Sequence, residues 1–432
     1  DFYKSNFSPY VTAQTDTLDK YYLFIEKGLA LLGNGGILSY IVPHKFMNIQ
    51  AGTKLRELLT SNSAVRKILH FGTYQVFKNR STYTCILVLS KQKNTEFEIG
   101  FVQDWNQFLF NHNTECRTYP EAYITGRPWS FLPQNIIAHL DAISESCVPL
   151  STLADIFVGL QTSADDIYII YADSEDENYV YFHNQQKEFK VEKGILRKGI
   201  YDTQITSYEK IVANCYIIFP YKEVNGRPIL YSLSEMSEKF PYALAYLSEY
   251  REKLDKRKMT GRKGDKWFAF GRSQSIRRFL SGEHLVWPVL SIGSNYVYDN
   301  EMVAFTGGGN GPFYGIEMKH SSQESIFYIQ AILNHWLMEL LVKSKASIFR
   351  GDYYSHGKQF IATLPIYKID FVNPTEVAKH QQIVEMVQNI MQLKEQLADA
   401  PNAARRTVLE HSITALNSDL NRAIDALYQV EL

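Results

Sequence analysis

The chain has 432 residues, a length that predicts two to four domains and sizeable buried cores. Hydrophobic residues make up 45% of the chain and charged residues 21%, so the composition excludes a disordered or collagen-like protein. The 45 Lys and Arg residues against 46 Asp and Glu give a net charge of −1. This balance excludes a basic coat over the whole surface but not a local basic patch.

The cysteine pattern and the hydropathy indicate the cellular compartment. The four cysteines are far apart in the sequence and form no C-x-x-C pair. This spacing argues against a disulfide scaffold or a zinc ribbon and is typical of a reducing, cytoplasmic environment. No apolar run approaches the length that crosses a bilayer, so we expect no membrane partner.

Helical and strand-like segments alternate over the first ninety residues. Helices are predicted at 17–33 and 51–60, and strands at 37–42, 65–71 and 82–90. The first helix has apolar side chains at steps of three and four and ends at Asn34-Gly35-Gly36. The run 37–42 is apolar on both faces, which predicts a buried strand in a covered, largely parallel sheet. This order of elements is typical of an α/β fold.

These elements amount to half of a doubly wound, Rossmann-like domain. Such a domain carries its Gly-rich nucleotide loop after its first strand, and no such loop follows the strands predicted here. We therefore expect the half with that loop to precede Asp1, and the chain to begin within a longer protein.

The sequence changes character twice beyond the α/β unit, which we assign to residues 1–105. Residues 106–150 are polar and aromatic and contain four prolines, which predicts a linker with one short helix. Residues 151–372 alternate short strands, charged turns and helices, which predicts an α+β domain. Residues 373–432 have apolar side chains at helical spacing, which predicts a helical hairpin.

The segment 251–278 has the strongest charge asymmetry in the chain. It holds eleven Lys or Arg residues against three acidic ones, a surplus of +8 in a chain that sums to −1. Trp267, Phe268 and Phe270 lie within it. Cations neutralise phosphates and rings stack on bases, so the segment predicts nucleic-acid binding. A solvated basic face is the alternative interpretation.

Three loops are further candidates for a binding site. Residues 159–166 (GLQTSADD) could present backbone N–H groups to an anion, although an ordinary β-turn is the simpler interpretation. Residues 306–312 (TGGGNGP) lack the spacing of a phosphate-binding loop, and we interpret them as a flexible hairpin tip. Phe77 lies in the loop 71–78, where a core position and a stacking platform are both open. The sequence shows no known spacing of a hydrolase or metal site.

Several of these stretches resemble TaqI-type N6-adenine DNA methyltransferases, including the fused restriction–modification enzymes and the BREX-type phage-defence methylases. LDKYYLFIEKGLALLGNGGILSYIVPHKFMN, at 18–48, resembles the stretch after the family's N-P-P-Y motif, and the similarity continues over 55–91. GLQTSADDIYII resembles the opening of the specificity domain, AILNHWLMELLVKSKASIFRGDYYSHGKQFIATLPI its end, and LNRAIDALYQVEL the terminal helix.

The resemblance implies a cofactor, S-adenosyl-L-methionine, that is bound mainly by residues outside this chain. The family binds S-adenosyl-L-methionine through a glycine loop and orients the target amine with N-P-P-[YF]. This chain has no Pro-Pro dipeptide, and Ser8-Pro9-Tyr10 lacks the Asn or Asp of that motif. The resemblance therefore implies that the chain starts after the motif, that the cofactor is bound mainly by a missing N-terminal half, and that the fragment alone is inactive.

The resemblance also implies site residues. Phe77 matches the family's aromatic at the V-F of the loop, which stacks on a flipped adenine. Residues 151–372 would be a target-recognition domain for double-stranded DNA, with residues that hold the DNA backbone: Arg257, Arg262, Lys263, Lys266, Arg272 and Arg277. Gln161 and Thr162 would contact DNA, and Arg350 would bridge within that domain or form a structural ion pair.

The sequence thus predicts the C-terminal part of an adenine-N6 DNA methyltransferase from a restriction–modification or phage-defence system. An endonuclease could be fused upstream, and the partners would be DNA and the catalytic half or other defence subunits. One alternative is a DNA-binding specificity subunit without catalysis. The other is an interaction protein that docks a partner through its helical hairpin.

Overall fold

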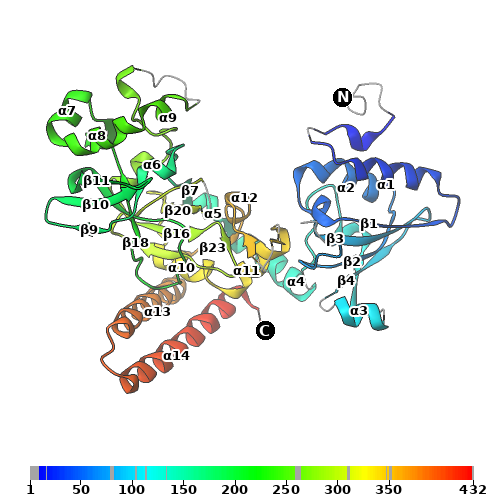
Figure 1. Ribbon diagram of the computed structural model, residues 1–432. Coiled ribbons are helices and arrows are strands. Elements are labelled where there is room, and N and C mark those ends of the chain that lie inside the picture. Colours follow the sequence, from blue (N-terminus) through cyan, green and yellow to red (C-terminus); the bar gives the residue numbers. More distant parts are fainter. Residues whose placement is uncertain are drawn as a thin grey trace. The chain divides into compact units, whose positions relative to one another are not determined.

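The computed structural model describes residues 9–15, 17–77, 82–102, 105–111, 114–132, 134–257, 264–308, 312–346, 348–349 and 353–430. The chain divides into two compact units (Figure 1). Unit 1 comprises Asp1–Pro133 and Lys343–Ser355, and unit 2 comprises Gln134–Val342 and His356–Leu432. The division falls within the expected linker 106–150. The short segment 343–355, which the sequence assigned to the recognition domain, folds with unit 1.

Unit 1 is built on a five-stranded sheet in the order β1-β3-β2-β4-β5. The strands are β1 (Ile37–Pro43), β2 (Val65–His70), β3 (Thr84–Ser90), β4 (Glu96–Phe101) and β5 (Cys116–Pro120). The helices are α1 (Lys20–Leu31), α2 (Thr53–Ser61) and α3 (Trp105–Asn111). In the returning segment, β21 (Ile348–Phe349) pairs with β22 (Tyr353–Ser355). The five predicted elements before residue 91 are therefore present, and β4 and β5 extend the sheet into the expected linker.

The expectation of a largely parallel sheet is wrong. Strand β3, which lies between β1 and β2, runs antiparallel to both, and among the described strands of this sheet β2 and β4 are the one parallel pair. The expectation that β1 is buried on both faces is also wrong, since Ile37 and Ile41 are 55% and 41% exposed. β1 is an edge strand of the described sheet, and Ile37 and Ile41 share one face of it, since side chains two or four residues apart point to the same side.

A buried arginine ties together the loops at one end of this sheet. Arg56, on α2, is 1% exposed, and its guanidinium donates to the carbonyls of Phe46, Ile49 and Gly126 at 2.5–3.0 Å. Carbonyl oxygens satisfy the buried cation, which would otherwise be costly to desolvate. Gly52 packs so closely on the Phe46 carbonyl that any Cβ would overlap it.

Unit 2 combines several small sheets with helices, as the expected α+β domain does. One sheet has the order β18-β16-β20-β7, and a second the order β19-β12-β13-β8. The strands of the first are β7 (Ala154–Val158), β16 (His284–Pro288), β18 (Val297–Asp299) and β20 (Phe313–Met318). Those of the second are β8 (Ile169–Ile170), β12 (Leu196–Ile200), β13 (Cys215–Ile218) and β19 (Ala304–Phe305). The core between them is rich in aromatic rings, including Phe157, Tyr168, Phe270 and Phe305.

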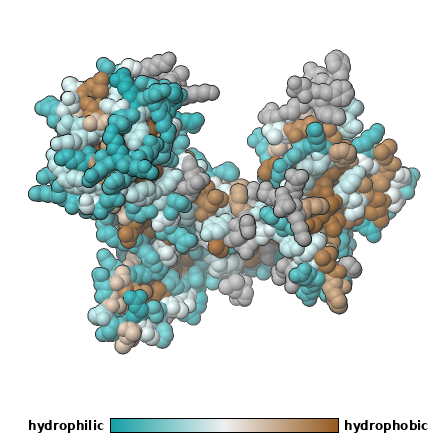
Figure 2. Space-filling view, in the orientation of Figure 1, coloured by the Kyte–Doolittle hydropathy of each residue, from teal (hydrophilic) through white to brown (hydrophobic). Residues whose placement is uncertain are grey.

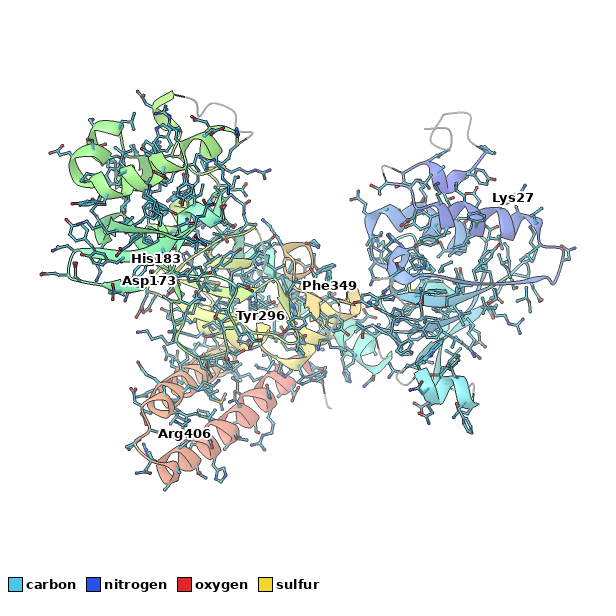
Figure 3. The ribbon with its side chains drawn as sticks, viewed as in Figure 1. Lys27, Asp173, His183, Tyr296, Phe349 and Arg406 are labelled. Atoms are coloured by element: carbon cyan, nitrogen blue, oxygen red, sulfur yellow. The ribbon has the colours of Figure 1, made fainter. Side chains whose placement is uncertain are left out.

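Smaller elements surround these two sheets. The strands are β6 (Cys147–Pro149), β9 (Ser174–Glu175), β10 (Tyr179–Asn184), β11 (Lys187–Glu192), β14 (Tyr221–Val224), β15 (Arg227–Leu230), β17 (Leu290–Ser291) and β23 (Pro365–Tyr367). The helices are α4 (Gln134–Ala142), α5 (Leu150–Leu153), α6 (Asp165–Tyr168), α7 (Leu233–Lys239), α8 (Pro241–Glu249), α9 (Arg251–Asp255), α10 (Ile326–Leu333), α11 (Trp336–Lys345) and α12 (Lys358–Ile361). At the surface of unit 2, the side chains of Asp173 and His183 are side by side, and the distance from Asp173 Oδ2 to His183 Nδ1 is 2.7 Å (Figure 3).

Two long antiparallel helices, α13 (Pro374–Ala398) and α14 (Ala403–Tyr428), end the chain and project from unit 2 (Figure 1). The side chains of Asn373 and Asn402 cap their N-termini, which satisfies backbone N–H groups that lack a helical partner. Of the expected seam on α14, Leu409, Ile413, Leu420, Ile424 and Leu427 are buried and Leu416 is half-buried. The predicted helical hairpin is therefore confirmed. Among the described residues, no helix is both long and apolar enough to cross a membrane.

Candidate nucleic-acid interface

Three loops that are far apart in the sequence meet at one surface of unit 2. We call residues 159–163, 271–274 and 306–308 the three-loop surface. Leu160 N–H donates to the Phe305 carbonyl at 2.8 Å, and Gly307 N–H donates to the Leu160 carbonyl at 3.1 Å. On the other side, Arg272 N–H donates to the Gln161 carbonyl at 3.1 Å. The loop 159–163 is thus held between the other two by backbone hydrogen bonds.

Glycines permit this close approach. A Cβ on Gly159 would lie 2.5 Å from the Thr306 carbonyl carbon, and one on Gly307 would lie 2.8 Å from the backbone nitrogen of Gly159. Real Cβ atoms do not come that close to backbone, so these positions require glycine. The glycines at 159 and 307 therefore have packing roles, whereas the sequence had suggested a β-turn and a flexible hairpin tip. Residues 309–311 of that tip lie outside the described residues.

Thr162 is closed to solvent, which argues against the expected contact with DNA. Its side chain is fully buried, and its hydroxyl donates to the Asp165 carboxylate and accepts from Ala164 N–H at 3.0 Å. Burial raises the pKa of Asp165 above its usual range, against the lowering effect of that hydrogen bond. Thr162 stabilises the turn, while its neighbour Gln161 is only half-buried and Ser163 is exposed.

Arg257 supports the three-loop surface from within the protein, which corrects its expected role as a phosphate contact. Its guanidinium donates to the carbonyls of Thr162 at 2.7 Å, Trp267 at 2.8 Å and Ala269 at 3.0 Å. A fourth bond, from Nε to the Leu254 carbonyl, is 2.9 Å long. Most of its donors are therefore used inside unit 2.

The aromatic side chains of the basic segment are part of the core. Trp267, Phe268 and Phe270 are at most 2% exposed, so the expectation that they stack on bases is wrong. The Trp287 and Tyr296 rings of the neighbouring sheet are buried as well; Figure 3 labels Tyr296. Stacking surfaces in unit 2 must come from other side chains.

The cations of the basic segment fall into two groups. Four form ion pairs with carboxylates of unit 2: Arg251, Lys253, Lys256 and Arg278. Lys266, Arg272 and Arg277 are exposed, and none of them has an ion pair within the described part of the chain. Arg262, Lys263 and Arg350 lie outside the described residues. Among the described cations of the segment, Lys266, Arg272 and Arg277 therefore remain available to phosphates, and Arg272 is on the three-loop surface itself.

In unit 1, the loop after β2 presents an exposed ring. Phe71 anchors its start, being 1% exposed and edge-on to Trp105, and the Tyr74 ring stacks on Trp105 with centroids 5.1 Å apart. Phe77 is 47% exposed, so the core alternative for this residue is wrong. Its stacking on a flipped base stays a prediction.

A cavity of about 900 Å³ opens within unit 1. Two histidines 26 residues apart line it, and their rings are in contact: His44 Nδ1 is hydrogen-bonded to His70 Nε2. Burial lowers the pKa of His44 to about 4 and that of His70 well below its usual value. The sequence analysis missed this pair. One feature of the sequence could have indicated it: His44 directly follows β1, His70 ends β2, and these are the two strands that flank β3.

Among the described residues of unit 1, no glycine-rich loop joins a strand to a helix N-terminus. The fold family of methyltransferases holds a nucleotide cofactor on a glycine loop between a strand and a helix N-terminus. In unit 1, Gly72 follows β2 but leads into no helix, and Gly100 lies inside β4, where a Cβ would collide with Thr114.

A buried Ser–His–Glu arrangement in unit 2 is structural. His356 Nε2 lies 2.8 Å from Glu339 Oε2, and Ser291 Oγ lies 3.4 Å from His356 Nδ1. The Ser291 hydroxyl, however, donates to the Gly293 carbonyl, and Ser291 and His356 are 6% and 1% exposed. A hydroxyl that is bonded elsewhere and closed to substrate is no nucleophile.

Comparison with known proteins gives matches to methylases and methyltransferases of restriction–modification systems. Residues 2–77 match the family described as Eco57I restriction-modification methylase. The chain is 29% identical over 391 residues to the Type II restriction enzyme and methyltransferase RM.Eco57I of Escherichia coli, covering 88% of this chain and 39% of that protein. It is 23% identical to the Type II methyltransferase M.BstVI of Geobacillus stearothermophilus, covering 88% of this chain and 66% of that protein.

A solved structure has a similar fold over nearly the whole chain. The Type IIL restriction-modification enzyme MmeI, determined in complex with DNA, superposes with a TM-score of 0.61 at 12% identity, covering 98% of this chain and 51% of that one. The chain thus spans about half of that structure and less than two thirds of the two sequence relatives. The resemblance found in the sequence is confirmed at the level of restriction–modification methylases: residues 2–77 match the Eco57I restriction-modification methylase family, and both sequence relatives are Type II methyltransferases, one of them also a restriction enzyme.

Proposed function

We propose that the chain is part of a site-specific DNA methyltransferase of a restriction–modification system and that it acts on adenine N6. In this proposal unit 2 recognises a duplex sequence, and unit 1 helps to hold the flipped target base. The observation that carries the proposal is the three-loop surface, where backbone bridges fix Gln161 beside Arg272. Rigid presentation of a short amide side chain and a guanidinium suits readout of base edges and phosphates.

The roles within unit 2 follow from exposure. Arg272, Arg277 and Lys266 neutralise phosphates, because they are exposed and have no ion pair among the described residues. Gln161 and Gln274, both on the three-loop surface, are the side chains placed to reach base edges. Arg257 holds the loops through their carbonyls and has no direct role at the DNA.

The role of unit 1 rests on Phe77 and on its sheet. An exposed ring on an anchored loop is suited to stacking on a base that has left the duplex. The open edge of β1 is suited to pairing with a further strand, and Figure 2 shows much hydrophobic surface on this unit. We infer that polypeptide outside this chain supplies that strand, the S-adenosylmethionine site and the catalytic N-P-P-[YF] motif. This chain alone is then inactive.

The proposal is tested by selecting bound duplexes from a random library at two salt concentrations and sequencing them. We expect an enriched motif that survives the higher salt, since base contacts persist when phosphate attraction is screened. Binding without a motif, lost at the higher salt, would contradict sequence recognition by this chain.

Two variants assign the motif to the three-loop surface. Gln274→Ala should relax the motif at one or two positions while the affinity for unrelated duplexes stays the same. Gln388→Ala, on the helical hairpin of the same unit, is the matched control and should leave the motif unchanged. A motif that is unaffected by Gln274→Ala and by Gln161→Ala would place base readout elsewhere.

A further inference from the structure

The two histidines of the unit 1 cavity meet because of the sheet register. Pro43, at the end of β1, pairs with Thr84 of β3, and His70, at the end of β2, pairs with Cys85. The two strands therefore end side by side across β3, and His44 directly follows the first of them. This geometry brings the rings within 4.1 Å of each other, centroid to centroid, at one end of the sheet.

The hydrogen bonds determine where each ring carries its proton. Gly72 N–H donates to His70 Nδ1 at 3.0 Å, so that nitrogen must be unprotonated. The proton of the neutral His70 ring is then on Nε2, which donates to His44 Nδ1. His44 in turn carries its proton on Nε2. Both rings are kept neutral by burial, which agrees with their lowered pKa values.

The hydrogen bonds from Gly72 to His70 and from His70 to His44 form a relay that ends at His44 Nε2. This atom is available to a ligand. Among the described residues, no partner takes His44 Nε2, and this nitrogen is not among the buried atoms that lack a hydrogen bond. Since His44 lines the cavity, the relay delivers one N–H donor to it. Gly72 N–H fixes the tautomer of His70, and His70 in turn fixes that of His44. The His44 proton cannot move from Nε2 to Nδ1 without breaking the His70–His44 and Gly72–His70 hydrogen bonds.

The rest of the cavity lining indicates the class of ligand. Rings make up much of the wall, among them Tyr83, Phe101, Phe131 and Phe349, the last of which is labelled in Figure 3. Lys45, paired with Asp19 at 2.7 Å, and Lys343, over the Tyr354 ring, add cationic groups. Flat apolar walls, cations and one fixed donor match a nucleotide, and the volume of about 900 Å³ is large enough for one.

We propose that His44 donates its Nε2–H to an acceptor atom of a nucleotide bound in this cavity, and that His70 is the positioning residue that sets its tautomer. The acceptor is a base nitrogen or carbonyl, or a phosphate oxygen. The inference rests on the proposed function, because DNA supplies the nucleotide.

The test is nuclear magnetic resonance on the 432-residue chain labelled with ¹⁵N-histidine. The ¹⁵N shifts distinguish a protonated from an unprotonated ring nitrogen, so they report the tautomer without any activity. At pH 7.5 we expect both His44 and His70 to carry the proton on Nε2. Deoxyadenosine 5′-monophosphate should shift the His44 Nε2–H signal saturably, and either deoxyadenosine or inorganic phosphate alone should reproduce the shift and so identify the acceptor.

Variants separate positioning from packing. His70→Asn keeps an acceptor for Gly72 N–H but has no N–H in the place of Nε2, so His44 should exchange between tautomers and the nucleotide affinity should fall about three- to tenfold. His320→Asn, an exposed histidine of unit 2, is the control and should change neither. An Nδ1–H tautomer for His44 in the wild-type chain would overturn the proposal.

A His44 signal that ignores deoxyadenosine 5′-monophosphate would also overturn it, provided that the same sample still binds duplex DNA. A chain that binds no duplex in the library selection would instead contradict the proposed function. The two failures are therefore distinguished by one sample and two ligands.

Discussion

Two arginines of the basic segment have opposite surroundings and give opposite expectations. Arg257 donates to four carbonyls inside unit 2, whereas Arg277 is exposed. Arg257→Gln should lower the free energy of unfolding of unit 2 by about 2–3 kcal/mol, because buried carbonyls lose a charged donor. Arg277→Gln should leave unfolding within about 0.5 kcal/mol of the wild type. Urea denaturation measures both changes.

The same pair separates a structural from an electrostatic effect on DNA binding. Arg277→Gln should lower the slope of log affinity against log salt by about 1, as expected for one lost phosphate contact. If Arg257→Gln changed that slope without changing the unfolding midpoint, the assignment of Arg257 to the protein interior would be contradicted.

Phe77 and Phe71 are six residues apart and differ in exposure, at 47% and 1%. Phe77→Ala should leave the free energy of unfolding within about 0.5 kcal/mol of the wild type, whereas Phe71→Ala should lower it by about 3–5 kcal/mol. For a duplex with an unpaired adenine at the recognised site, Phe77→Ala should weaken binding by about 1–3 kcal/mol, the usual value of one base–ring stack. Fluorescence titration of 2-aminopurine at that position measures this loss, and an unchanged affinity would argue against stacking.

At the scale of elements, the edge strand β1 predicts association of the isolated chain. Ile37 and Ile41 are exposed on a strand with an open edge, and exposed apolar edges pair with other chains. Ile41→Lys should reduce concentration-dependent association in sedimentation experiments, with no change in the urea midpoint beyond about 0.5 kcal/mol. Val408→Lys is the control, because Val408 is an exposed apolar residue on α14 and not on a strand edge. Association that is unaffected by Ile41→Lys would show that this edge is not the contact.

Periodicity predicted the elements that bury one face, and burial explains where it failed. The helices α1 and α14 and the strands β2 and β3 have long apolar patterns, which is why they were found. β4 and β5 are short and alternate with polar residues, and in the case of β5 the prolines of 106–150 indicated a linker instead. Trp267 and Phe270 were wrongly predicted to be exposed because they are flanked by lysines and arginines in the sequence. In the structure both rings are buried in the core.

The candidate sites depended on contacts that one-dimensional spacing does not contain. Gln161 and Arg272 are 111 residues apart and become neighbours only through a β-bridge. His44 and His70 meet only through the register of β3. Sequence reasoning could therefore name the basic segment and Phe77, but it could not tell Arg257 from Arg272.

At the scale of the whole molecule, buried histidines predict a loss of stability in mild acid. Desolvation lowers the pKa of His44, His284 and His335 to about 4, and it lowers those of His70 and His380 as well. The unfolded chain takes up these protons near pH 6.5, while the folded chain stays neutral until about pH 4. The stabilisation is therefore complete above pH 6.5 and is lost as the pH falls from 6.5 towards 4.

The expected slope is large enough to measure. Each such histidine contributes at most about 1.4 kcal/mol per pH unit in this window, so unfolding by urea should become markedly easier between pH 6.5 and 5. Asp165 and Asp299, whose pKa values burial raises, oppose the trend, because the folded chain takes up their protons at a higher pH than the unfolded chain does. Glu235, whose pKa falls to about 2 beside Lys222, adds its own loss only below its unfolded value near 4.5.

His284→Gln tests the assignment within unit 2. The side chain is 1% exposed and its Nε2 is buried without a hydrogen bond, so it gains a proton only on unfolding. The variant should reduce the dependence on pH of the free energy of unfolding, measured with urea, by the contribution of one histidine, which is at most about 1.4 kcal/mol per pH unit. This holds even if the substitution also changes the stability at pH 7.5. His320→Gln, which is exposed, should leave the slope unchanged. A wild-type midpoint that is constant from pH 6.5 to 5 would mean that these rings are not buried in their neutral form.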